Sequence, residues 1–117
     1  MLKKPADCRD VYDLLDYNIR PRPGMWARSL QELEAMLLGY SVALEVHSVP
    51  EEFAFGARGP FTNWLGSTYG WGMSLGRAVA IEQHLQDEET PIDAFFRLTD
   101  QYRTTREPNT AQEVGDI

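Results

Sequence analysis

The sequence predicts an all-α fold, a compact bundle of four to five helices around a central apolar helix at about residues 30–47. Apolar residues recur at three- and four-residue spacings in several separate stretches, as they do on one face of an α-helix. Helix-start signals stand at Ser29 and at Thr90. No stretch shows the strict apolar–polar alternation of a half-buried strand, so we expect helices only.

The first helix is expected at residues 8–19, with Asp7 as its N-cap. Its apolar positions repeat at helical spacing and are Val11, Leu14, Leu15 and Ile19. Two prolines within residues 20–24 exclude a continuing helix, so we expect an extended linker there.

The central helix at residues 30–47 is the clearest element of the sequence. Ser29 and Glu32 have the spacing of a capping box. One apolar stripe consists of Leu30, Leu33, Leu37, Tyr40, Leu44 and His47, and a second consists of Leu38, Val42 and Val46. A helix that is apolar over most of its circumference is enclosed by other helices or lies in an oligomer interface. We therefore place this helix at the centre of the fold.

Three further helices are expected after the loop at residues 48–60. The first begins at Pro60 and ends at Gly70, a residue suited to the C-terminal cap. The second is capped by Ser74 and runs to about Gln86, with inward positions Leu75, Ala78, Val79, Ile81 and Leu85.

The last helix is expected to start at Thr90, and one of its faces carries Ile92, Phe95, Phe96, Thr99 and Tyr102. From about Thr105 the apolar periodicity is lost. We therefore expect residues 1–104 to form a single helical domain and residues 105–117 to form a polar, flexible tail.

The composition favours some classes of partner over others. Eighteen acidic residues stand against 11 basic ones, and the formal net charge is -7. That balance disfavours nucleic-acid and anionic-membrane binding, which need clustered Lys and Arg, and it suits a basic protein partner. The chain has a single cysteine, Cys8, no signal-peptide pattern at its start, and no apolar run of membrane-spanning length. We therefore expect a cytoplasmic protein.

Residues 69–77, which include three glycines, do not match a nucleotide-binding motif. Trp71 stands where a Walker loop needs glycine, and Leu75 stands where a dinucleotide fingerprint does. Two interpretations remain open. The segment is either a tight helix–helix connection or a recognition loop that presents Trp71 and Met73 to a partner.

Metal-binding and catalytic motifs are absent from the sequence. His47 and His84 belong to no metal-ligand pair, and Cys8 lies close to carboxylates that oppose thiolate formation. There is no Gly-x-Ser-x-Gly nucleophile motif. We therefore expect no catalytic residue, no metal and no cofactor, and we predict that the protein is not an enzyme.

The stretch Trp64–Tyr102 carries a family resemblance. It contains WLGSTYGWGMSLGRAVAIEQH and the helix IDAFFRLTDQYR, and a Leu-Gly-Tyr sequence lies in the helix before it. Over most of residues 29–103 the chain resembles small acidic immunity proteins of bacterial polymorphic-toxin systems. The resemblance implies a role as a toxin inhibitor and assigns no functional residue.

The predicted function is that of an immunity protein that neutralises a cognate, basic toxin domain by stoichiometric occlusion. Acidic side chains would steer the toxin and a few aromatic side chains would supply affinity. One candidate surface consists of Trp71, Met73, Arg77, Asp87, Glu88 and Glu89, and the competing one of Asp10, Asp13 and Asp16. The alternative is a homo-oligomeric helical scaffold or regulatory subunit, such as a homodimer, that buries the surplus apolar face of the central helix.

Overall fold

A computed structural model describes the backbone of residues 3–115 and the side chains of residues 3–106. All regular elements in this part of the chain are helical, which confirms the predicted fold class. The elements are η1 (Pro5–Asp7), α1 (Val11–Asp13) with its π-helical continuation η2 (Leu14–Ile19), η3 (Pro23–Met25), α2 (Leu30–Val46), α3 (Pro60–Tyr69), α4 (Arg77–Glu82) and α5 (Pro91–Gly115). No described helix has the length and apolar character that crossing a bilayer requires.

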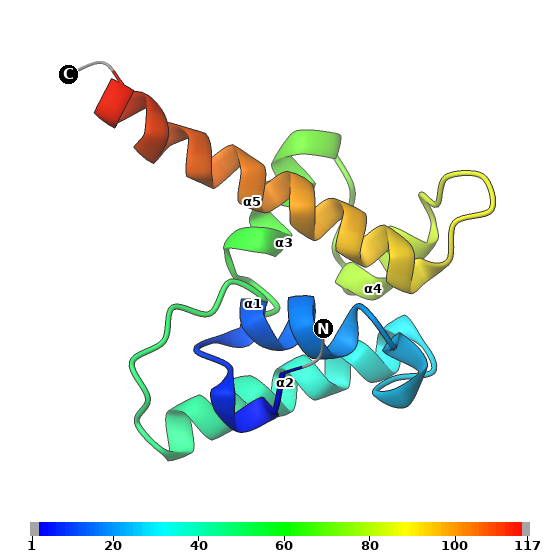
Figure 1. The fold of residues 1–117 in the computed structure, drawn as a ribbon. Coiled ribbons are helices and arrows are strands. Elements are labelled where there is room, and N and C mark those ends of the chain that lie inside the picture. The colour runs from blue at the N-terminus through cyan, green and yellow to red at the C-terminus, as the bar shows by residue number, and fades with distance from the viewer. Residues whose placement is uncertain (1–2, 116–117) are drawn as a thin grey trace.

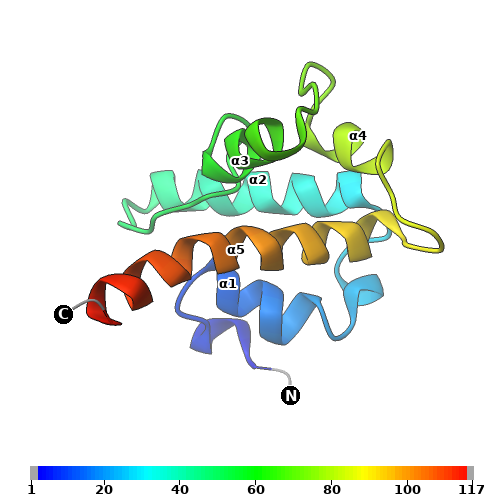
Figure 2. The same ribbon diagram turned by 90° about the horizontal axis from the view of Figure 1, so that it is seen from above.

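Helix α5 organises the bundle. It packs against α2, α3 and α4, and it runs across the whole molecule in both views of the fold (Figures 1 and 2). Its inward face meets an aromatic cluster in which the ring centroids of Phe55, Phe61 and Phe95 lie 5.3–5.9 Å apart. Phe61 and Phe95 are fully buried. Burial of these rings supplies much of the hydrophobic stabilisation of the fold.

The first helical segment starts later than predicted. Its N-cap is Asp10, whose Oδ1 accepts a hydrogen bond from the Asp13 backbone N–H at 3.0 Å, so the expected cap at Asp7 is wrong. Asp7 instead ends the separate turn η1. The linker after Ile19 is not fully extended either, because Pro23 begins the 3₁₀ turn η3, where its fixed φ fits.

Helix α2 begins where predicted, and Ser29 Oγ accepts a hydrogen bond from the Glu32 N–H at 3.1 Å. Its buried side chains, Leu30, Leu33 and Leu37, all belong to its first half. The second predicted stripe faces outward, with Leu38 65%, Val42 49% and Val46 70% exposed. The helix is therefore enclosed on one side only.

Helix α4 is shorter than predicted, and its N-cap is Gly76 instead of Ser74. Gly76 has φ +94°, a conformation that L-residues rarely adopt, and its N–H closes a turn onto Met73 O at 3.0 Å. Ser74 and Leu75 lie in this turn. Leu75 is consequently 73% exposed, and its predicted inward position is wrong.

Helix α5 begins as predicted, with Thr90 Oγ1 accepting a hydrogen bond from the Asp93 N–H at 3.1 Å. It continues to Gly115, so its backbone stays helical past Thr105, where we expected a tail. Figure 1 shows these last turns leading away from the other helices. Apolar periodicity reports packing against a core, so it does not detect a helical segment that leaves the bundle.

Candidate partner-binding surface

The carboxylates of the first predicted acidic face are engaged within the chain. Asp10 caps α1, and the buried Asp13 accepts hydrogen bonds from the Arg9 backbone N–H and from Arg9 Nε, both at 3.0 Å. The Arg9 side chain holds the pKa of Asp13 well below its ordinary value. Asp16 pairs with Arg103 Nη1 at 2.8 Å. Asp13 as a partner-binding residue is therefore wrong, because its carboxylate is buried and already paired.

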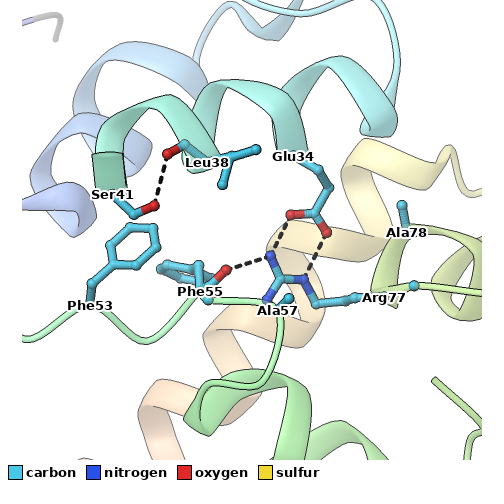
Figure 3. Close-up of a pocket in the computed structure, with 10 residues that line it drawn as sticks. Glu34, Leu38, Ser41, Phe53, Phe55, Ala57, Arg77 and Ala78 are labelled. Atoms are coloured by element: carbon cyan, nitrogen blue, oxygen red, sulfur yellow. Dashed lines mark hydrogen bonds and ion pairs between the residues drawn. The ribbon is translucent and has the colours of Figure 1, made fainter. Parts of the chain in front are cut away.

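Arg77, predicted to face a partner, is buried instead. Its guanidinium forms an ion pair with Glu34 of α2 and donates a hydrogen bond to Phe55 O at 2.9 Å (Figure 3). It also donates a hydrogen bond to Thr62 Oγ1 at 3.0 Å. These contacts tie α4 to α2, to α3 and to the preceding loop. The prediction for Arg77 is wrong because the sequence shows a cation but not the distant residues that bind it.

A groove of about 280 Å³ lies beside this ion pair, with Leu38 and Phe53 in its lining (Figure 3). Glu34 is bound to Arg77, and Ser41 Oγ donates to the Leu38 carbonyl at 2.8 Å. These polar side chains are engaged within the chain, so the groove offers mainly apolar contacts to a ligand.

Three rings stack at the surface near the end of α3. The centroids of Tyr69 and Trp71 lie 4.7 Å apart with planes inclined by 20°, and those of Trp71 and His84 lie 4.3 Å apart with planes inclined by 12°. Trp71 is half-buried, whereas Tyr69 is 40% exposed and His84 is exposed. His84 Nδ1 lies 2.7 Å from the Ala80 carbonyl oxygen, which fixes the imidazole orientation.

The sequence indicated Trp71 but not its two neighbours. The stack joins the last residue of α3, the glycine-rich connection and the turn that follows α4, and it depends on the left-handed Gly70 (φ +71°), which turns the chain back. The Tyr-Gly-Trp spacing was the available signal, since a glycine between two aromatic residues permits such a reversal.

The acidic turn at residues 87–89 begins three residues after His84, the last ring of this stack, and it is attached to the same helix, α5. The Tyr69 hydroxyl donates to Gln101 Oε1, and one turn earlier on α5 Arg97 Nε binds Glu89 Oε2 at 2.7 Å. Residues one turn apart on α5 therefore hold both the ring stack and the acidic turn. Figures 1 and 2 show the connection between α4 and α5 projecting beyond the helices.

Glu89 is the internal anchor of the turn. Its carboxylate also accepts the Gln86 N–H at 3.0 Å, and the Arg97 guanidinium lowers the pKa of Glu89. Glu89 is thus engaged within the chain, and its assignment as a partner-binding residue stays a prediction. Asp87 and Glu88 remain exposed at the tip of the turn.

The aromatic–acidic surface is defined as Tyr69, Trp71, His84, Asp87 and Glu88. Met73 lies beside it in the chain and is half-buried against the core, so it supports the connection more than it extends the surface. The surface presents rigid aromatic area beside exposed negative charge. This combination suits a protein partner that carries apolar and basic groups.

Groups suited to catalysis do not converge in the described residues. No group of three or more His, Cys, Asp or Glu side chains that could hold a metal occurs in this part of the chain. Burial, with the Asp13 carboxylate, raises the pKa of the Cys8 thiol, which opposes the nucleophilic thiolate form. His84 bonds to a backbone carbonyl and stacks on Trp71, so it is not paired with a nucleophile in this arrangement.

No protein-family model, curated protein or solved structure matches the chain. The resemblance to immunity proteins therefore stays a prediction.

Proposed function

We propose that this chain is a cytoplasmic immunity protein that binds a basic bacterial toxin domain and neutralises it by stoichiometric occlusion, without catalysis of its own. The observation that carries the proposal is the aromatic–acidic surface, in which a fixed ring stack is followed, three and four residues after His84, by two exposed carboxylates. Occlusion requires shape and charge complementarity, and it needs neither a metal nor a cofactor.

The ring stack suits an interface anchor because it is held before binding. Tyr69 is tied to α5 through Gln101, and His84 is tied to Ala80, so little side-chain freedom is lost when a partner covers them. Aromatic side chains held in this way dominate the binding energy of many protein interfaces.

The exposed carboxylates of Asp87 and Glu88 supply the electrostatic attraction for a basic toxin domain. The net charge of -7 attracts a basic domain at long range, and carboxylates on a projecting turn act at short range. Such complementarity raises the association rate more than it lowers the dissociation rate.

The test is co-expression with the product of the neighbouring reading frame. The proposal predicts that this product is toxic alone, that the present chain suppresses the toxicity, and that the two proteins co-purify. A harmless neighbour, or a toxicity unchanged by co-expression, contradicts the proposed function.

The surface is tested separately with paired tryptophan variants. Trp71→Ala is expected to weaken the complex at least 30-fold, equivalent to about 2 kcal/mol for a dominant anchor. Trp26→Ala is the matched control, because Trp26 is also half-buried and belongs to another part of the fold. Equal binding by the Trp71→Ala variant and the wild-type protein would overturn the assignment of this surface.

A further inference from the structure

A hollow of about 640 Å³ lies between one side of α3 and the connection that leads to α4. We call it the Arg58 hollow, and its polar lining residues are Arg58, Thr62, Asn63, Ser67, Ser74 and Arg77. Its lining includes no carboxylate, although the chain has a net charge of -7. Four other hollows on the described part of the surface each include at least one, namely Glu34, Glu52, Glu45 with Glu51, and Glu82 with Asp93. The Arg58 hollow is therefore suited to an anion.

Arg58 is the cation that a ligand can reach. Its side chain is exposed and forms no ion pair or hydrogen bond within the described part of the chain. Its backbone is held to α3, because Asn63 Nδ2 donates a hydrogen bond to the Arg58 carbonyl oxygen at 3.4 Å. A guanidinium presents several N–H donors in one plane, which matches the geometry of an oxyanion.

Arg77 also lines the Arg58 hollow, but its charge is already paired. The Glu34 carboxylate binds its Nε and Nη2 and lines the neighbouring groove (Figure 3). Arg77 Nη1 is bonded instead to Thr62 Oγ1 at 3.0 Å, on the side of the Arg58 hollow. The uncompensated charge in the lining is therefore that of Arg58.

Neutral hydrogen-bond donors complete the lining. Ser67 lies on α3 and Ser74 lies in the connection, and both are exposed. Neither hydroxyl is engaged within the described residues. The two hydroxyls and the Arg58 guanidinium come from three different segments. A phosphate group has oxygens that point in several directions, so it suits donors arranged in this way better than a planar carboxylate does.

We propose that the Arg58 hollow binds a small molecule that carries a phosphate group, with Arg58 as the charged contact and Ser67 and Ser74 as hydroxyl contacts. The volume lies in the range of small-molecule sites. The net charge of -7 disfavours a polyanion such as a nucleic acid. The hollow shares no residue with the aromatic–acidic surface, so the proposal does not depend on toxin binding.

The first test is a titration of the wild-type chain with inorganic phosphate at low ionic strength, followed by ¹H–¹⁵N NMR. Saturable shifts are expected at amides of residues 57–58, 62–67 and 73–77. Arg58→Gln is expected to weaken phosphate binding at least about 10-fold, because a charge-assisted contact is lost. Arg28→Gln is the matched control and is expected to bind as the wild-type protein does. Arg28 is also exposed, but it lines a hollow that contains carboxylates.

A carboxylate introduced into the hollow tests the site without removal of a cation. Ser67→Asp is expected to abolish phosphate binding, because the new charge repels the anion. Thr68→Asp is the control, since Thr68 is the next exposed position on α3 and does not line the hollow. Acetate serves as a second probe of the wild-type chain and is expected to bind more weakly than phosphate.

A wild-type chain without saturable phosphate shifts at these amides overturns the proposal. It is also overturned if Arg58→Gln and Arg28→Gln weaken binding equally, or if Ser67→Asp binds phosphate as tightly as Thr68→Asp. Acetate that binds as tightly as phosphate would contradict the assignment of a phosphate group.

Discussion

The two acidic clusters of this protein look equivalent in the sequence and differ in the structure. Each places three carboxylates within a short segment. Around α1, Asp10 caps the helix, Asp13 binds Arg9 and Asp16 binds Arg103. Between α4 and α5, only Glu89 is paired, and Asp87 and Glu88 face solvent.

The difference arises from the cations that the fold brings near each cluster. Arg103 reaches Asp16 from 87 positions away in the chain, which no local pattern indicates. The turn at residues 87–89 projects from the bundle, and Arg97 reaches only its last member. A charged cluster is therefore available to a partner only where the chain's own cations do not occupy it.

The largest loss of folding stability is expected when a buried arginine that pairs with a carboxylate inside the protein is removed. Arg77→Ala leaves Glu34 without its partner in a mostly buried site and is expected to destabilise the fold by about 3 kcal/mol. Arg58→Ala, at an exposed position, is the control and is expected to change stability by less than about 0.5 kcal/mol. Urea unfolding measures the free energy of unfolding of both variants. Equal losses would contradict the view that a buried, paired charge stabilises this fold more than an exposed one.

A smaller loss of stability is expected when the pH is lowered and Asp13 is protonated. The lowered pKa of Asp13 means that the unfolded chain binds more protons there than the folded chain does. Its stabilising contribution is complete above the ordinary aspartate pKa of about 4 and is lost as the pH falls below that value. Asp13→Asn should therefore be less stable at neutral pH and lose less stability on acidification.

The control for this titration is Asp87→Asn, which removes a carboxylate from the solvent-facing cluster. Thermal unfolding at a series of pH values should give the same acid dependence for Asp87→Asn as for the wild-type protein. An unchanged acid dependence in Asp13→Asn would contradict the account of the α1 cluster.

The smallest effect on stability is expected at the tip of the projecting turn. Asp87→Lys combined with Glu88→Lys is expected to shift the free energy of unfolding by no more than about 0.5 kcal/mol, since neither side chain is buried. A larger loss by urea unfolding would show that these carboxylates hold the fold, as those of the α1 cluster do.

Local signals predicted three helix boundaries and misplaced the N-caps of α1 and α4. Ser29, Thr90 and Gly70 act as predicted, because each depends on residues within one turn of itself. The partners of Arg77 were not predictable, since Glu34 and Phe55 are distant in sequence.

The contacts within the aromatic–acidic surface were not predictable either, because they join residues from different elements. Trp71 could be identified as unusual, but its stacking on His84 requires α4 to end at Glu82, before His84, whereas the sequence predicted a helix running to about Gln86. The helical backbone of α5 beyond Thr105 was missed because a helix outside the core shows no apolar stripe in the sequence.

The role of the α4–α5 turn in toxin binding is measured as the rate of association with the co-purified toxin at low and at high salt. The Asp87→Lys/Glu88→Lys variant is compared with Asp7→Lys/Glu52→Lys, which reverses two exposed carboxylates elsewhere. The first variant is expected to associate at least 10-fold more slowly at low salt, and the second is expected to associate nearly as fast as the wild-type protein. Equal slowing by both variants would show that only net charge matters and would contradict a binding surface at the α4–α5 turn.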